Sequence, residues 1–138
     1  MESTISMQDM RYLNLFSKMT GVSTRFCFMY NEFITFCVPK NLVSKAIGEN
    51  GKNVKKMGEI LGRKIKVIPM PLGPQDIRKF MGFIVNPLTF RNLEIKGNEI
   101  IITAGIQSKA ALIGKNKRRL IELQKVAKEY FNKELRII

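Results

Sequence analysis

Two short loops carry the residue types that bind phosphate groups, and they read GENG at 48–51 and GKNK at 114–117. Glycine has no Cβ, so a sugar-phosphate backbone can lie directly against the peptide there. A helix that begins after such a loop adds unpaired backbone N–H groups and the positive end of its dipole. Basic residues follow the first loop in KNVKK at 52–56, and the second loop ends in a basic run, KRR at 117–119. This pattern indicates a phosphate-binding loop that occurs twice.

A structural explanation of the glycines also exists, because glycine commonly ends one helix and opens the next. An isolated GxxG pattern would favour that explanation, since the pattern is common by chance. Three features favour binding here: a short helix is predicted before each loop, a basic helix is predicted after it, and the text recurs. VSKAIGENGKNV aligns with KAALIGKNKRRL, which places Gly48 in register with Gly114.

The charge of the chain points to a polyanionic partner. Lysine and arginine total 24 against 11 acidic residues, for a formal net charge of +13 over 138 residues. Such an excess favours nucleic acid first and an anionic membrane surface second. No apolar run reaches the roughly 18 residues of a membrane span, and the first residues lack the pattern of a signal peptide. We therefore expect a cytoplasmic protein with no membrane partner and no small-molecule substrate.

Catalytic and metal-binding constellations are missing from the sequence. There is no histidine, which is the commonest general base at neutral pH, and we find no paired carboxylates, nucleophile elbow or Walker loop. The two cysteines, Cys27 and Cys37, make a poor zinc site without histidine. They fall in the two strands of one predicted hairpin, so buried free thiols and a cross-strand disulfide both stay open. We expect no enzyme, no cofactor and no metal.

The elements of the first half follow from periodicity and caps. Ser6 with Asp9 forms an acidic variant of the capping box at the start of a helix, and Gly21 can close that helix. Alternating apolar residues then predict strands on either side of a turn at Asn31 and Glu32. The expected elements after the first helix are strands at 25–30 and 33–38, a short helix at 42–47, a helix at 52–61 and a strand at 64–69.

The second half repeats this order after a Pro- and Gly-rich linker at 69–74, PMPLGP. We expect a helix at 75–84, strands at 88–96 and 99–104, a short helix at 108–113, a long helix to residue 131 and a strand at 135–138. The sequence therefore predicts an α+β tandem duplication with domains at 1–70 and 71–138. Each half is small for an independent core, so we expect the two halves to pack as one rigid unit.

With these residues in place, a family resemblance becomes visible. VSKAIGENGKNVKKMGEILGRKIKVI resembles a KH domain, and the helix-first, strand-last order is that of the type II version. The tandem pair, with MRYLNLFSKMTG ahead of it, resembles the archaeal NusA-like transcription factor family over about residues 5–138. The resemblance implies a single-stranded RNA-binding protein that clamps about four nucleotides with each GXXG loop. It also implies a role in transcription elongation, termination or antitermination.

The resemblance names the residues expected to contact RNA. Two of them depart from the family pattern: Glu49 stands where family loops often carry a basic residue, and Lys117 replaces the second glycine of the second loop. Arg119 adds charge behind that loop. The expected RNA-binding residues are Lys45, Ile47, Gly48, Glu49, Asn50, Gly51, Lys52, Asn53, Lys55 and Lys56 in the first half, and Gly114, Lys115, Asn116, Lys117 and Arg118 in the second.

Two other functions fit the same residues. Ribosome-associated proteins also use type II KH folds, so the RNA partner can belong to the ribosome. Alternatively, the chain is an adaptor on RNA polymerase whose KH halves no longer hold RNA. RNA polymerase is in any case a candidate partner alongside single-stranded RNA.

Overall fold

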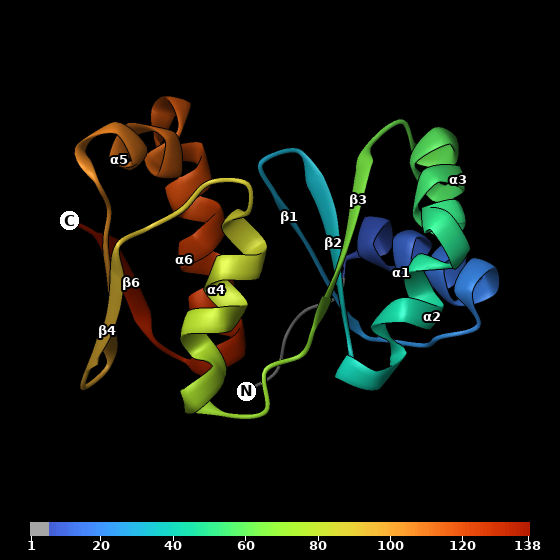
Figure 1. Cartoon of the computed structure of the whole chain (residues 1–138), viewed down its shortest axis with the longest axis horizontal. Coiled ribbons are helices and arrows are strands. Elements are labelled where there is room, and N and C mark those ends of the chain that lie inside the picture. Colours follow the sequence, from blue (N-terminus) through green and yellow to red (C-terminus); the bar gives the residue numbers. More distant parts are fainter. Residues whose placement is uncertain (1–5) are drawn as a thin grey trace. The chain divides into compact units, whose positions relative to one another are not determined.

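The computed structural model describes residues 6–138, and the chain divides into two compact units, one ending at Leu72 and one spanning Gly73–Ile138. Both units are α+β and run helix, strand, strand, helix, helix, strand (Figure 1), as predicted. The first unit contains α1 (Met7–Thr20), β1 (Phe26–Tyr30), β2 (Phe33–Val38), α2 (Val43–Ile47), α3 (Lys52–Leu61) and β3 (Lys64–Pro69). The second contains α4 (Ile77–Val85), β4 (Asn92–Lys96), β5 (Glu99–Thr103), α5 (Ile106–Ile113), α6 (Arg118–Phe131) and β6 (Glu134–Ile137).

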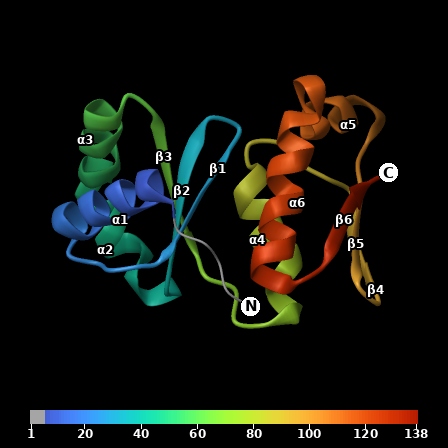
Figure 2. The same cartoon turned by 180° about the vertical axis from the view of Figure 1, so that it is seen from behind.

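Each unit is built on a three-stranded sheet with its strands in sequence order. The middle strand β2 pairs antiparallel with β1 and parallel with β3, and β5 pairs in the same way with β4 and β6. Parallel neighbours need a crossover, which α2 and α3 supply in the first unit and α5 and α6 in the second. In both views the helices of each unit lie on one face of its sheet (Figures 1 and 2). The two loops predicted to bind phosphate are the joints inside these two crossovers.

The core of the first unit lies between its sheet and its helices. Alternate residues of β2 point to the helices, and Phe36 stacks on Phe16 of α1 with ring centroids 4.2 Å apart. Met57 of α3 is fully buried in the same cluster, with Leu61 packed against it. The full cluster comprises Phe16, Val22, Ile34, Phe36, Val38, Ala46 and Met57.

Helix α1 begins and ends at the residues that its sequence indicates. The Ser6 Oγ accepts a hydrogen bond from the Asp9 backbone N–H at 3.0 Å, which satisfies one of the free donors of the first turn. Gly21 adopts a left-handed conformation (φ 72°) and donates its N–H to the Ser17 carbonyl.

The sheet faces turned away from the helices differ between the units. In the first sheet, register and alternation place Phe26, Phe28 and Phe33 on that face. In the second sheet the corresponding face carries charged residues, including the ion pair between Arg136 and Glu99 at 3.0 Å. The outer faces of the two sheets therefore differ, the first carrying aromatic side chains and the second mainly charged ones.

The predicted strand at 88–96 was wrong at its start. The strand begins at Asn92, and Leu88 instead donates its N–H to the Val85 carbonyl at 2.8 Å in a turn that follows α4. Arg91 makes the first bond across the hairpin, to the Thr103 carbonyl. The apolar residues Leu88 and Phe90 alternate as strand residues do, but α4 ends at Val85 and the backbone of residues 86–90 forms a turn and an irregular segment.

The hairpin register settles the state of the cysteines. Cys27 lies opposite Phe36, whereas Cys37 lies opposite Phe26, so the two thiols point to different faces of the sheet and do not form a disulfide with each other. Burial, with the Asp9 carboxylate as a smaller cause, raises the pKa of the Cys27 thiol to about 12. None of the helices formed by residues 6–138 has the length and apolar character of a membrane span.

Candidate nucleic-acid interface

The first loop is a single tight turn between α2 and α3. Gly48 ends α2 at φ 83°, ψ 164°, and residues 49–51 form one 3₁₀ turn in which the Gly51 N–H donates to the Gly48 carbonyl at 3.0 Å. Asn50 (φ 55°, ψ 25°) and Gly51 (φ 72°, ψ 20°) both adopt the left-handed conformation. Asparagine and glycine are the residues that accept this conformation most readily.

The second loop has the same backbone in spite of its different sequence. Gly114 (φ 77°, ψ 170°) ends α5, and the Lys117 N–H donates to the Gly114 carbonyl at 3.1 Å. Asn116 (φ 58°, ψ 28°) and Lys117 (φ 61°, ψ 20°) repeat the two left-handed residues. Lys117 therefore occupies the glycine position without changing the path of the chain.

The two glycine positions of a loop have different structural requirements. A Cβ on Gly48 would lie 2.9 Å from the Asn53 Cγ, and a Cβ on Gly114 would lie 2.9 Å from the Arg119 Cγ, so neither position has room for a side chain. A Cβ on Gly51 would have the Val54 Cγ2 as its nearest neighbour, at an ordinary 3.7 Å. Packing thus demands the first glycine, while the second position tolerates a side chain that accepts the backbone conformation. This difference explains how GKNK keeps the fold of GENG.

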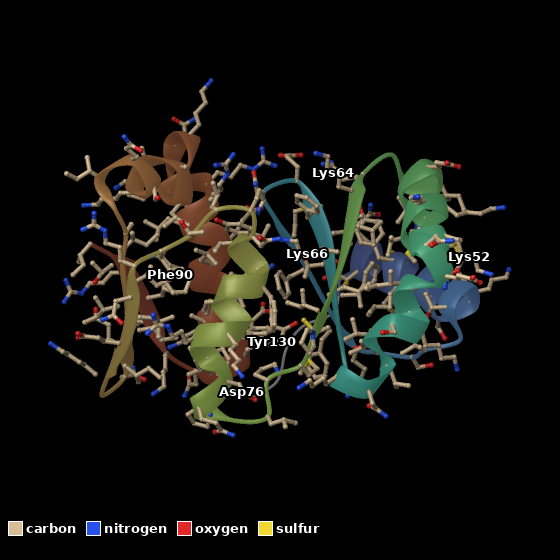
Figure 3. The ribbon with its side chains drawn as sticks, viewed as in Figure 1. Lys52, Lys64, Lys66, Asp76, Phe90 and Tyr130 are labelled. Carbon is tan, nitrogen blue, oxygen red and sulfur yellow. The ribbon has the colours of Figure 1, made fainter. Side chains whose placement is uncertain are left out.

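Both loops open into helices whose N-termini can receive an anion. No side chain caps the start of α3 or α6, and the first-turn N–H groups of a helix lack partners within it. Exposed cations surround these starts: Lys52, which Figure 3 labels on α3, with Lys55 and Lys56 in the first unit, and Lys115, Lys117 and Arg118 in the second. Glu49 and Asn50 are also exposed, so the carboxylate of Glu49 opposes an anion at the first loop.

In the first unit, the side chains of two predicted site residues, Lys45 and Asn53, do not extend from the exposed surface of the loop. The Lys45 side chain runs to the end of α1, where its Nζ would be 3.7 Å from a Cβ on Gly21. Asn53 turns its amide toward α2, and its Nδ2 donates to the carbonyls of Ala46 at 3.2 Å and Lys45 at 3.4 Å. Ile47 is half-buried at the end of α2.

The structure also shows the surroundings of three cations that lie outside the predicted set of RNA-binding residues. Arg119 belongs to the basic run after the second loop, but its Nη1 donates to the Ala111 carbonyl of α5 at 2.7 Å. Lys64 and Lys66 project from β3 (Figure 3), with their Nζ atoms 5.6 and 4.8 Å from the centroid of the Phe33 ring. Partial burial lowers the pKa of Lys66. Their alternation with Ile65 and Val67 is the sequence signal that places them on the face opposite the helices.

Comparison with known proteins relates the chain to archaeal transcription proteins, although it matches no protein-family model. The probable transcription termination protein NusA of Methanococcus vannielii is 28% identical over 130 residues, which cover 89% of this chain and 73% of that protein. The protein of the same name from Methanocaldococcus jannaschii is 26% identical over 130 residues, covering 91% of this chain and 69% of that one.

A solved structure supports the fold independently. The crystal structure of APE1850 superposes with a TM-score of 0.67, and the match covers 97% of this chain and 100% of that one at 24% identity. At this identity the likeness concerns the fold alone. In sequence, over about nine tenths of its length, the chain is therefore similar to archaeal proteins named as probable transcription termination protein NusA.

Proposed function

We propose that this chain binds single-stranded RNA through its two loops and acts in transcription termination, elongation or antitermination. The observation that carries the RNA-binding part is the recurrence of one loop backbone in both units, at Gly48–Gly51 and Gly114–Lys117, although only one loop keeps both glycines. The part that concerns transcription rests on two relatives, each named a probable transcription termination protein. The proposed activity is binding, and no catalytic step belongs to it.

Single strands suit these loops better than duplexes do. A KH-type surface grips the phosphates with backbone N–H groups and reads bases through edges that pairing would hide. The exposed cations beside both loops add an attraction that depends on salt, and the net charge of +13 strengthens it.

Titration of a fluorescent single-stranded RNA oligomer against salt tests this function. If about four to six phosphates are neutralised, log affinity should fall against log salt with a slope of about −3 to −4. Between 50 and 200 mM salt, that slope corresponds to a loss of about 60- to 250-fold in affinity. A blunt duplex of the same length is the control and should bind more weakly. A flat salt response, or equal affinity for the duplex, would contradict RNA binding of this kind.

The first loop is proposed as the main clamp, with the second extending the electrostatic footprint. Changing Glu49 and Asn50 together to Asp adds one negative charge, keeps both glycines and places residues that tolerate the turn. The change should weaken RNA binding by about 1–3 kcal/mol, by analogy with the loss of charge-assisted hydrogen bonds. The matched pair, Lys115 and Asn116 to Asp, should lower affinity and flatten the salt slope with less effect on base preference. If only the second pair abolishes sequence preference, the two roles are reversed.

RNA polymerase is the proposed macromolecular partner. The names of both relatives favour the transcription machinery over the ribosome. Affinity capture of the tagged chain from a native extract, followed by identification of the bound subunits, should recover polymerase subunits. Recovery of ribosomal subunits in their place would move the chain to ribosome-associated proteins.

A further inference from the structure

In each unit, the second residue of the helix after the loop reaches back to the helix before it. The Asn53 Nδ2 donates to the Ala46 and Lys45 carbonyls at 3.2 and 3.4 Å, and the Arg119 Nη1 donates to the Ala111 carbonyl at 2.7 Å. These acceptors lie in the last turns of α2 and α5, where helix carbonyls lack partners within the helix. Two different side chains thus tie the start of one helix to the end of another, across the loop.

The same side chains fill the space beneath the first glycine of each loop. The site of a Cβ on Gly48 lies 2.9 Å from the Asn53 Cγ and 3.1 Å from its backbone N, and the site on Gly114 lies at the same distances from the Arg119 Cγ and N. The loop, the helix start and the tethering side chain are therefore packed against one another. Loss of the tether would leave the loop free to change its path.

We propose that Asn53 and Arg119 are positioning residues, which hold the loops in the geometry that presents backbone N–H groups to phosphate without contacting phosphate themselves. This inference rests on the proposed RNA-binding function and deepens it. The role of Arg119 is the less expected of the two. This residue belongs to a basic run, but its guanidinium group donates to a backbone carbonyl of the protein. In the first unit the same task falls to the neutral Asn53.

The first measurement is made without RNA. In Asn53→Ala, hydrogen exchange at the Gly51 N–H, which bonds to the Gly48 carbonyl, should accelerate several-fold. In Arg119→Ala the Lys117 N–H should behave in the same way. Asn14→Ala, at an exposed position of α1, is the control for loss of an asparagine elsewhere. Unchanged exchange at Gly51 and Lys117 in the two tether variants would overturn the inference.

The second measurement is RNA affinity as a function of salt. Loss of the tether should weaken binding by about 3- to 10-fold, the size expected for one or two hydrogen bonds, and should leave the salt slope unchanged. For Arg119→Ala this is a sharp test, because an arginine that neutralised a phosphate would carry about 0.7 of the slope on a single strand. A slope that falls by that amount in Arg119→Ala would mean a direct phosphate contact and would overturn the assignment.

A variant that carries the tethering residue of the second unit separates positioning of the loop from contact with RNA in the first unit. Asn53→Arg gives the first unit the side chain that the second unit uses. It should restore slow exchange at Gly51 and recover the affinity lost in Asn53→Ala at an unchanged slope. A slope steeper by about 0.7 would place the new arginine on the RNA and contradict the tether. If exchange responds as expected but the wild-type chain binds no single-stranded RNA, the tether stands and the proposed function fails.

Discussion

Lys117 holds a backbone conformation that side chains rarely adopt. Its φ of 61° and ψ of 20° match those of Gly51 in the first loop, and a Cβ in the left-handed region costs about 1–2 kcal/mol. The second unit accepts this cost at the point where its loop gains an exposed ammonium group. Compared with glycine, lysine at this position raises the conformational energy of the backbone and adds one positive charge to the loop.

Replacing Lys117 with Gly should raise the free energy of unfolding by about 0.5–1 kcal/mol, because the relief of strain exceeds the extra chain entropy of glycine. Urea denaturation measures this effect. Lys115→Gly is the matched control, since it removes the same charge from the same turn at a residue whose φ is not positive. That control should be destabilised by about 0.5–1 kcal/mol. Equal shifts in the two variants would show that charge, not backbone strain, controls stability here.

At the scale of single residues, part of the candidate site could be predicted from the sequence. The glycines, the cations and the helix starts could be predicted, because each has a local signal in residue type and spacing. The conformation of Lys117 could not, since lysine gives no indication of a left-handed backbone. The orientations of Asn53 and Arg119 were also missed, because their acceptors belong to the preceding helix and a basic run favours the interpretation of every member as exposed.

Among the elements, α3 shows why a glycine within a helix can be required. A Cβ on Gly58 would lie 2.9 Å from the carbonyl oxygen of Arg63, a backbone atom that cannot move independently. The turn that leads from α3 into β3 folds back over the helix at this point, and the Gly58 carbonyl accepts hydrogen bonds from the N–H groups of Gly62 and Arg63. In α4, by contrast, a Cβ on Gly82 would meet nothing within 4 Å.

These two helical glycines give opposite expectations for one substitution. Gly82→Ala should raise the free energy of unfolding by about 0.5–1 kcal/mol through helix propensity. Gly58→Ala should lower it by about 1–3 kcal/mol, the usual cost of overpacking, despite the same gain in propensity. Thermal or urea unfolding of both variants provides the measurement. Stabilisation by Gly58→Ala would contradict the close approach of the Arg63 carbonyl.

The type and order of the elements followed from the sequence more readily than their boundaries. Caps located α1 at both ends, and alternation located β1, β2 and β3, because these signals are local. The start of β4 was placed too early, since the turn after α4 carries Leu88 and Phe90 at strand spacing. Apolar periodicity reports which side chains turn inward and does not distinguish a half-buried turn from a strand.

For the whole molecule, the rigid packing of the two units stays a prediction. The connection between β3 and α4 is short and contains Pro71 and Pro74, which limits its flexibility. The outer face of the first sheet carries the rings of Phe26, Phe28 and Phe33 beside Lys64 and Lys66, and aromatic side chains gathered on one face favour coverage by another surface. Both features favour joint motion of the units.

NMR relaxation tests the prediction at this scale. The two units should share one rotational correlation time, because joined bodies tumble together. A variant with a long Gly-Ser insertion between Leu72 and Gly73 supplies the comparison, since a flexible linker of this composition uncouples domains. Clearly different correlation times for the two units of the wild-type chain would refute the rigid arrangement.

The parallel pairing of β2 with β3 has a consequence for the order in which the first unit opens. The β1–β2 hairpin closes between neighbours in sequence, whereas the pairing of β2 with β3 spans α2, the loop and α3 along the chain. Detachment of β3 would remove its contacts with α3 and so weaken the support of the helix that begins at the loop. A ligand that binds the loop only in the closed form should protect the last strand from local unfolding, by an amount that grows with the ratio of free ligand concentration to its Kd. A nucleic acid bound at Gly48–Gly51 would in this way stabilise β3 through the loop and α3, without a direct contact to that strand.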